Sequence, residues 1–394
     1  MQLNLKNHLR GDWQIWSILL VLSLLSIAVV YSSSSALAFR NAGGNTEYYL
    51  LRHSVHITLG LVITYLVHKY NYTNFAGISK LLLWTMPFLL LYTLKFGVNV
   101  GGAKRWVSIL GMTFQTSDII RLVLITNLAA MLAKRQNVAY NRNTIYGLII
   151  WCGGLCGLLA VSNFSTAAIL GFTCFMIMWI GRVPTKYLLG MAASVISMLI
   201  LAIGVSIFLQ KQGIEFGRGR TVVERTESFV SKDLDGDGFI GNKHRNDKLQ
   251  REAALIAIAR GGPKGLGPGK SFQRNTLPEA FSDYIYAIII EEYGMLGGFG
   301  VMVLYLWLLY RGLKNIELTD RAFGGLLSVG LSLSIVFQAF AHMFINVGLG
   351  PVTGQTLPLI SMGGTSILFT SIAIGIILSV SRGEYDEKQL LRKG

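Results

Sequence analysis

The run WQIWSILLVLSLLSIAVV, from Trp13 to Val30, carries no charged side chain. A helix needs about 20 apolar residues to cross the hydrocarbon core of a bilayer. Comparable runs recur along the whole chain of 394 residues. They are continuous rather than alternating, so they indicate membrane helices and not barrel strands. We therefore expect an all-α integral membrane protein.

The composition points the same way. Hydrophobic residues make up 52% of the chain, charged residues only 14%, and the mean hydropathy is +0.51, whereas a soluble domain carries about 25% charged residues. The net charge of +15 would suit nucleic-acid binding. However, the basic residues lie mainly in short loops between apolar runs, a pattern that orients membrane proteins and attracts anionic lipid headgroups. We therefore exclude nucleic acid as the partner.

About ten spans are expected, in one membrane domain that covers residues 1–394. The first run could instead be a signal peptide, because Lys6 and Arg10 precede it and residues 36–38 resemble a cleavage site. Its length and the many spans after it favour a retained helix. The expected spans are 14–35, 50–68, 78–96, 116–133, 145–161, 166–181, 187–209, 284–310, 325–347 and 365–381.

Basic residues cluster before the first span, in every even-numbered loop and in the tail 382–394. By the positive-inside rule these segments are cytoplasmic, so the odd-numbered loops face outward from a cytoplasmic (inner) membrane that the chain crosses many times. Three outward loops are unusual. Residues 101–106 carry two cations, 210–283 form a long loop of mixed charge, and 348–364 are rich in Gly and Pro but uncharged.

Two patterns raise the question of metal binding. Cys152, Cys156 and Cys174 lie in apolar runs, whereas zinc sites need more ligands and a polar setting, so we interpret them as helix-packing residues. Residues 233–238, DLDGDG, match the first half of a calcium-binding EF-hand loop. His244 stands where a bidentate Glu is expected, which leaves either a weak calcium site or a plain acidic turn.

Asp283 lies where the long polar loop returns to lipid. Such a carboxylate could act as a general base in a partly dry, outward-facing cavity, with a pKa raised by burial and lowered by a nearby cation. Alternatively, Ser282 or Asp283 could cap the following helix by accepting backbone N–H bonds. Spacing alone favours the cap, although the two roles are compatible.

Two pairs of charged residues lie inside the expected spans. Glu291 and Glu292 lie about two turns into the eighth span, where charge is costly, so a structural ion pair is favoured over a cavity lining. Asp118 and Arg121 are i, i+3 neighbours that can pair on one helix face. That pair could be purely structural, or it could hold Arg121 toward a site in the bundle.

Three further segments have more than one interpretation. Lys104 and Arg105, beside Trp106, suit a pyrophosphate or an interfacial anchor equally well. The glycine-rich residues 261–271 fail the spacing of a phosphate-binding P-loop, so we interpret them as a flexible loop that contacts substrate. Residues 354–366 indicate an irregular re-entrant element, tolerated at membrane depth only when packed in protein or lining a cavity.

Three of these segments together resemble the SEDS family (shape, elongation, division and sporulation), which includes the FtsW, RodA and SpoVE proteins. Residues 102–107, GAKRWV, resemble the family's G-A-x-R-W-I. Residues 277–294 resemble L-P-E-x-x-x-D-F-I-F-A followed by E-E-x-G, and 351–366 resemble P-x-x-G-x-x-L-P-x-I-S-Y-G-G-S-S. The order and the topological positions also match, so the resemblance covers nearly the whole chain.

The chain departs from the family pattern at several positions. The family's Q-P-S-E followed by Lys is Gln115-Thr116-Ser117-Asp118 with Arg121 here, so both charge signs survive. The family's Q-P-D-x-G-T corresponds to residues 162–166 without the acid, which puts any role of that acid in doubt. Met362 replaces a Tyr.

The resemblance implies a peptidoglycan glycosyltransferase that polymerises lipid II and works with a class B penicillin-binding protein and other division proteins. The acid that matches Asp283 is the family's proposed catalytic base. No cofactor is certain, although a divalent cation (Mg²⁺ or Mn²⁺) could accompany the pyrophosphate. The expected substrate-binding residues are Lys104, Arg105, Trp106, Asp118, Arg121, Glu279, Ser361, Gly363 and Gly364.

Two other function classes stay open. A lipid II flippase would also need a polar path through the bundle, but it gives no reason for an acid at an outer loop beside cations. A scaffold that only recruits the transpeptidase predicts that substitutions of Asp283 are silent. Within the family, residues 355–358 and 361–365 favour the division type, as in FtsW, over the elongation type, as in RodA.

Overall fold

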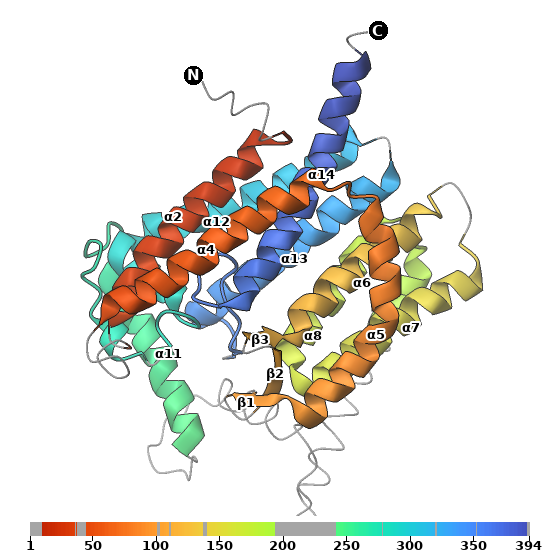
Figure 1. Ribbon diagram of the computed structural model, residues 1–394. Helices are drawn as coiled ribbons and strands as arrows, with labels where there is room; N and C mark the ends of the chain where they lie inside the picture. The colour runs from red at the N-terminus through yellow and green to blue at the C-terminus, as the bar shows by residue number, and fades with distance from the viewer. Residues whose placement is uncertain are drawn as a thin grey trace, which may run out of the picture.

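The computed structural model describes residues 10–35, 37, 45–100, 103–109, 112–136, 140–193, 242–277, 279–319, 321–351 and 353–391. Long helices lie side by side in a bundle, and three short strands lie at one end of it (Figure 1). The elements are α2 (Trp13–Ser33), α4 (Thr46–Lys69), α5 (Asn74–Phe96), β1 (Val98–Val100), β2 (Ala103–Ile109), β3 (Met112–Gln115), α6 (Thr116–Ala133), α7 (Arg142–Ser162), α8 (Phe164–Ile180), α11 (Asn242–Gly261), the 3-10 helix η1 (Gln273–Asn275), α12 (Ile285–Leu318), α13 (Ala322–Asn346) and α14 (Thr365–Leu391).

Within the described ranges, eight helices are long and apolar enough to cross a membrane: α2, α4, α5, α6, α7, α12, α13 and α14. The 17 residues of α8 fall just short of that length but coincide with the expected sixth span. Residues 185–193 are helical where the expected seventh span begins, and the rest of that span lies outside the described residues. The prediction of a helical membrane protein with about ten spans is confirmed.

Both ends of the described chain lie at the same end of the bundle, where α2 begins and α14 ends (Figure 1). The Asp12 amide donates to Ser381 Oγ over 3.0 Å, and Arg311 Nε pairs with Asp12 Oδ2 at 2.5 Å. Arg382 donates to the carbonyl of Lys69 over 2.8 Å, so the second loop lies there too. This arrangement agrees with an even number of spans. That this end faces the cytoplasm stays a prediction.

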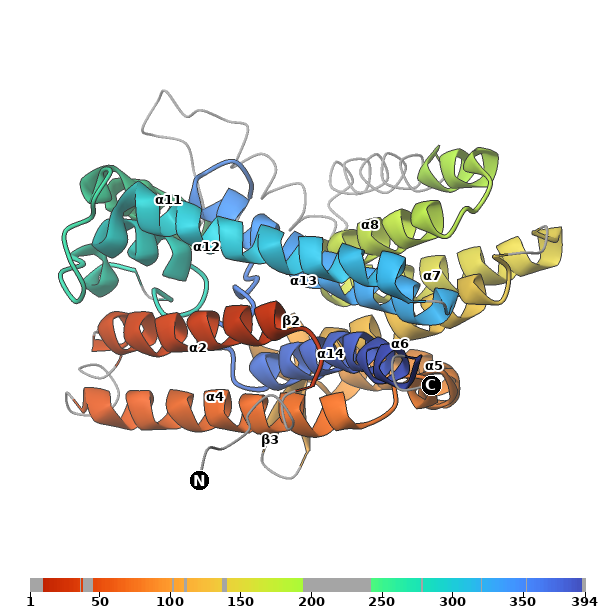
Figure 2. The ribbon, with the colours of Figure 1, turned by 90° about the horizontal axis from the view of Figure 1, so that it is seen from above.

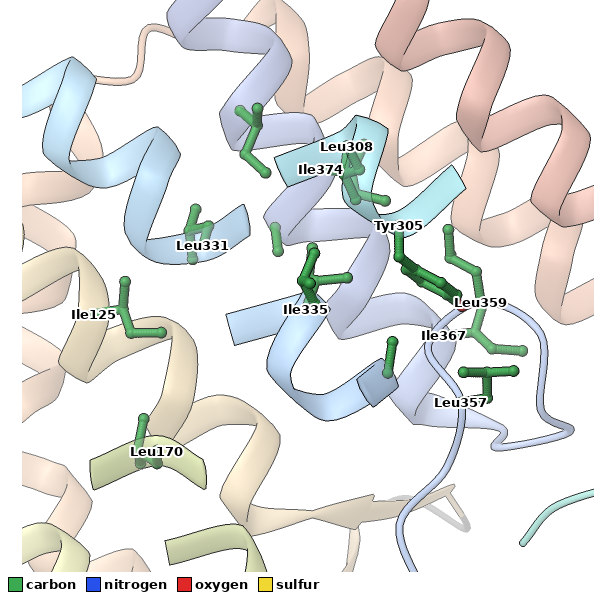
Figure 3. Packing of buried hydrophobic residues seen from close by; sticks show 14 of the residues in the cluster. Ile125, Leu170, Tyr305, Leu308, Leu331, Ile335, Leu357, Leu359, Ile367 and Ile374 are labelled. Atoms are coloured by element: carbon green, nitrogen blue, oxygen red, sulfur yellow. The ribbon is translucent and has the colours of Figure 1, made fainter. Parts of the chain in front are cut away.

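Helices α13 and α14 form the centre of the bundle. Figure 2 shows α14 among α2, α4 and α6, and α13 packs along α12. The segment before α14 turns into this core, where Leu357 and Leu359 are buried beside Tyr305 and Ile367 (Figure 3). Tyr305 also donates its hydroxyl to the carbonyl of Pro358. The expected re-entrant element is therefore present and packed in protein.

The loop expected between the third and fourth spans folds into a small sheet. Its strands run antiparallel in the order β1-β2-β3, with Trp106 opposite Gln115 and Val107 opposite Phe114. Thr365 Oγ1 donates to the carbonyl of Thr113 over 2.9 Å and ties the sheet to the start of α14. Strand pairing satisfies backbone N–H and C=O groups of this loop that would otherwise lack partners in the protein.

Helix α12 is broken at Gly294, where φ is +73° and ψ is −178°. A break at membrane depth leaves N–H and C=O groups without helical partners. The glycine-rich loop after α11 supplies those partners. Leu266 N donates to the carbonyl of Glu291 over 2.9 Å, and Met295 N donates to the carbonyl of Gly262 over 2.8 Å. The loop therefore closes the break.

This contact requires glycine on the loop side. A β-carbon on Gly261 would lie 2.0 Å from the carbonyl oxygen of Ile290, and one on Gly265, where φ is +82°, would lie 2.2 Å from that of Glu292. The interpretation of residues 261–271 as a flexible loop is therefore wrong for this part of it, whereas its contact with substrate stays a prediction. The glycines permit close backbone packing against α12.

The two buried acids of α12 serve the same loop. Glu291 accepts from the backbone N–H groups of Phe272 and Gln273, over 3.1 and 3.2 Å, and so caps the 3-10 helix η1. Glu292 accepts from the N–H of Ser271 over 3.3 Å. The favoured ion-pair interpretation is wrong within the described residues, because the donors that reach both side chains are neutral backbone N–H groups and serine hydroxyls.

The metal-binding patterns are only partly described. Cys152 and Cys174 are buried in α7 and α8 as free thiols, as expected for packing residues. Residues 233–238 lie outside the described part of the chain, so the weak calcium site there stays a prediction. Among the described residues, no group of three or more His, Cys, Asp or Glu is placed to hold a metal ion.

The loop that closes the α12 break provides a stability test. The substitution Gly261→Ala forces a methyl group against the Ile290 carbonyl, and overpacking of this kind costs roughly 1–3 kcal/mol. We expect a clearly lower melting temperature in detergent. In the matched control, Gly300→Ala, the methyl group meets nothing within 4 Å, and Ala favours a helix over Gly by up to about 1 kcal/mol. Equal melting of Gly261→Ala and the parent protein would contradict the packed-loop interpretation.

Candidate functional site

Asp283 ends a turn that precedes α12, at the end of the bundle opposite to Asp12 and Arg311. Its amide donates to the carbonyl of Glu279 over 3.0 Å, and its Oδ1 accepts from Ser282 Oγ over 3.1 Å. Tyr284 is the N-cap residue of α12, and neither Ser282 nor Asp283 accepts a hydrogen bond from the first N–H groups of this helix through its side chain. The capping interpretation that spacing favoured is therefore wrong, and the carboxylate has no such structural task.

The backbone around Asp283 is held from two sides. Asn346, at the end of α13, donates its amide to the carbonyl of Asp283 over 2.9 Å. Ser361, in the segment before α14, donates to the carbonyl of Ser282 over 2.8 Å, and Met362 N donates to that of Phe281 over 3.0 Å. The turn is thus fixed between two distant parts of the chain.

Arg105 reaches the same place from strand β2. A β-carbon on Gly354 would lie 3.4 Å from Asp283 Oδ2 and 3.8 Å from Arg105 Nη1. The acid and the guanidinium therefore both lie close to Gly354, which has no side chain to crowd them, and φ of +66° at Gly354 also favours glycine. Arg105, Asp283 and Gly354 come from the three unusual loops that the sequence predicts to face outward, so all three loops meet at this point.

The electrostatics of this arrangement suit a general base. The pKa of Asp283 is raised to about 7, first by burial and then by the negative charge of Glu279, while the Ser282 hydroxyl and Arg105 oppose the rise. A base works best when its pKa lies near the operating pH. Near neutral pH a large fraction of Asp283 is thus a carboxylate that is basic enough to accept a proton.

The expected ion pair between Asp118 and Arg121 is present at the start of α6, with Nη2 and Oδ1 2.7 Å apart. The pair borders a cavity of about 20 Å³ inside the bundle, together with Ser334 and Thr370, which is room for about one water molecule. Arg121 also donates to Gln338 Oε1 of α13. The pair therefore lies within the helix bundle and connects to the site through Gln338.

The other predicted site residues fall into two groups. Glu279 and Ser361 lie beside Asp283 or hold its turn. Trp106 pairs within the sheet, and Gly363 and Gly364 form the approach to α14, with φ of +52° at Gly364. Lys104 lies in β2, and the structure describes only its backbone. Substrate contact by any of these residues stays a prediction.

The sequence interpretation missed four residues that build the site. Gly354 lies close to both Asp283 and Arg105, while Gln338, His342 and Asn346 reach out from α13. A signal for the last three was present. They are polar residues at positions i, i+4 and i+8 of an apolar run, and this spacing places them on one helix face.

Comparisons with known proteins agree on one family. A family model described as "Cell cycle protein" (FtsW, RodA, SpoVE) matches residues 12–386. The probable peptidoglycan glycosyltransferase FtsW of Alkalilimnicola ehrlichii is 32% identical, and the match covers 94% of this chain and 89% of that protein. For the probable peptidoglycan glycosyltransferase FtsW of Bacillus subtilis the identity is 30%, with 96% and 92% covered.

Solved structures share the fold. A chain from a study of how a peptidoglycan synthase complex coordinates polymerization and crosslinking aligns with a TM-score of 0.71 at 22% identity, covering 95% of this chain and 98% of that one. The rod shape determining protein RodA of Thermus thermophilus aligns with a TM-score of 0.66 at 22% identity, covering 96% and 99%. Because the family model spans nearly the whole sequence, this chain belongs to the FtsW/RodA/SpoVE family of cell cycle proteins, the SEDS family.

Proposed function

We propose that this protein is a peptidoglycan glycosyltransferase that polymerises lipid II into glycan strands, and that it acts in cell division, in the synthesis of the septal wall. The names of its relatives support the activity. The observation that carries the proposal is the Asp283 carboxyl, held at the end of the bundle opposite the termini, with a pKa raised to about 7 and with Arg105 nearby.

The reaction is a single inverting displacement. Asp283 accepts the proton of the 4-hydroxyl of the acceptor N-acetylglucosamine, and that oxygen attacks the anomeric carbon of the donor N-acetylmuramic acid. The bond to undecaprenyl pyrophosphate breaks as the new glycosidic bond forms, and the configuration inverts. One base is sufficient, because pyrophosphate is already a good leaving group and needs no strong acid.

The leaving pyrophosphate gains charge in the transition state and needs nearby cations. Arg105 is placed for this role because it lies beside Asp283, and its planar guanidinium can bind phosphate oxygens in pairs. Lys104 is the neighbouring cation in the sequence. A divalent cation, Mg²⁺ or Mn²⁺, would bind the pyrophosphate oxygens of the substrate and leave the Asp283 carboxylate to act as the base, because Mg²⁺ commonly binds substrate phosphates.

The proposed location and partner follow from this chemistry. Lipid II polymerisation at the outer face requires a multi-pass protein of the cytoplasmic membrane with the Asp283 end outward. The glycan product must be crosslinked, so we assign a class B penicillin-binding protein as the transpeptidase partner, within the division machinery. An elongation role, as in RodA, predicts lateral rather than septal localisation of a fluorescent fusion.

Replacement of the proposed base tests the function. Asp283→Asn keeps the shape of the side chain but removes its basicity, and loss of a general base lowers rates by about 10²- to 10⁴-fold. Polymer formation from labelled lipid II is measured with the purified chain and its transpeptidase partner. Glu47→Gln, an exposed acid in the first turn of α4, is the matched control and should retain the parent rate. Full activity of Asp283→Asn would refute the assignment, and transport of labelled lipid II across liposomes without polymer would indicate a flippase.

The pH profile of polymerisation tests the electrostatics. Asp283 accepts a proton only when deprotonated, so the rate should rise with pH to a plateau, with its midpoint near 7. Arg105→Gln removes the charge that lowers the pKa and should move the midpoint upward. Glu279→Gln removes the charge that raises it and should move the midpoint downward. Shifts in the same direction, or a midpoint near the ordinary aspartate value, would count against Asp283 as the titrating group.

A further inference from the structure

Helix α13 carries three polar side chains at intervals of four residues: Gln338, His342 and Asn346. All three are buried, with at most 3% of any one exposed. Residues four apart lie on the same face of a helix, one above the other. They therefore form a single stripe along α13, which we call the α13 polar stripe.

Two members of the stripe hold the segment that carries Gly354. Gln338 Nε2 donates to the carbonyl of Thr356 over 2.9 Å. His342 Nδ1 lies 2.7 Å from the carbonyl oxygen of Gln355, and the ring nitrogen is the donor because a carbonyl only accepts. Two successive carbonyls of an irregular segment are thus fixed to one helix.

The third member holds the proposed base. Asn346 Nδ2 donates to the carbonyl of Asp283 over 2.9 Å, and Asn346 Oδ1 accepts from the N–H of Ala287 over 3.1 Å. One amide therefore joins the backbone of the base to the first turn of α12. Neither contact involves the Asp283 carboxylate itself.

One rigid element consequently sets the separation of the two halves of the site. A helix rises 1.5 Å per residue, so the stripe from Gln338 to Asn346 spans about 12 Å of fixed length. At one end it holds the segment next to Gly354, and at the other it holds Asp283. Because Asp283 Oδ2 and Arg105 Nη1 both lie close to Gly354, a shift of the Asp283 backbone changes the gap between base and cation, and a shift of the Gly354 segment changes the surface against which both lie.

The stripe also connects the site to α6. Gln338 Oε1 accepts from Arg121, which is paired with Asp118, while the amide nitrogen of Gln338 holds Thr356. The orientation of one amide thus depends on the guanidinium on one side and on the carbonyl on the other. The ion pair can therefore influence the site through Gln338, and Arg121 need not touch substrate to do so.

We propose that the α13 polar stripe positions the general base against the Gly354 segment, and that Gln338 transmits the position of the Asp118–Arg121 pair to it. The expected effect on kcat rests on the proposed function. The expected effect on backbone order rests on the geometry alone. Its members are positioning residues, because they act through the backbone of other residues. A merely structural stripe would lower stability while leaving the turnover of the folded protein unchanged.

Four variants separate these roles in the purified full chain, assayed with lipid II alone and with the transpeptidase. Asn346→Ala and Gln338→Met remove the contacts at the two ends. His342→Leu removes the central donor, whereas His342→Gln retains an amide that can donate. Since a 1 Å misplacement can cost about 10²-fold in rate, we expect kcat to fall about 10- to 100-fold in the first three, with KM within about 3-fold and partial rescue in His342→Gln.

The matched control is Ser328→Ala on the same helix. It removes a buried hydrogen bond from Asn315 Nδ2, 2.9 Å long, which joins α13 to α12 away from the site. We expect a lower melting temperature with an unchanged kcat. Stripe variants that melt like this control but keep the parent kcat would overturn the proposal.

Backbone hydrogen exchange provides a readout that needs no activity. Gln338→Met and His342→Leu should speed exchange in peptides covering residues 353–361, and Asn346→Ala should do so in peptides covering 281–288, whereas Ser328→Ala should change neither. If these rates change but the parent protein makes no polymer, the positioning holds and the proposed function fails. If exchange in these peptides matches the parent protein, the stripe does not position them and the proposal is refuted.

Discussion

Every backbone N–H and C=O group inside a membrane bundle needs a partner from the protein, because lipid offers none. Helices meet this requirement internally, but this chain also places irregular segments at the same depth. The loop at 261–267 closes the break of α12 at Gly294, and the segment 355–361 is bonded to α13 and to its own Ser361. The functional end of the molecule is built from these non-helical segments.

The same requirement explains why an acid is useful there. Irregular backbone that is tied down on all sides excludes water, and burial raises the pKa of Asp283 to about 7. A nearby guanidinium then limits the rise, and Arg105 occupies that place from the β2 strand. Positioning and basicity therefore have one origin, which is the packing of polar segments into an otherwise apolar bundle.

Much of the fold was predictable from local sequence, but less of the site was. Continuous apolar runs determine the spans because length and hydropathy alone decide insertion. The roles of Glu291, Glu292 and the loop at 261–267 were predicted wrongly because they depend on a break in α12 that periodicity does not reveal. The expected order of spans correctly predicted that the three unusual loops lie at the same end of the bundle. The approach of Arg105 and Asp283 to Gly354 depends on long-range packing that no local pattern encodes.

The central claim is that Asp283 is a buried carboxyl poised to accept a proton near neutral pH. Infrared difference spectroscopy of the intact protein measures this directly, through the carboxyl band that disappears in Asp283→Asn. The account predicts that this band titrates with a midpoint near 7. A midpoint near the ordinary value for aspartate, about 3.9, would show a solvated carboxylate and would contradict the account.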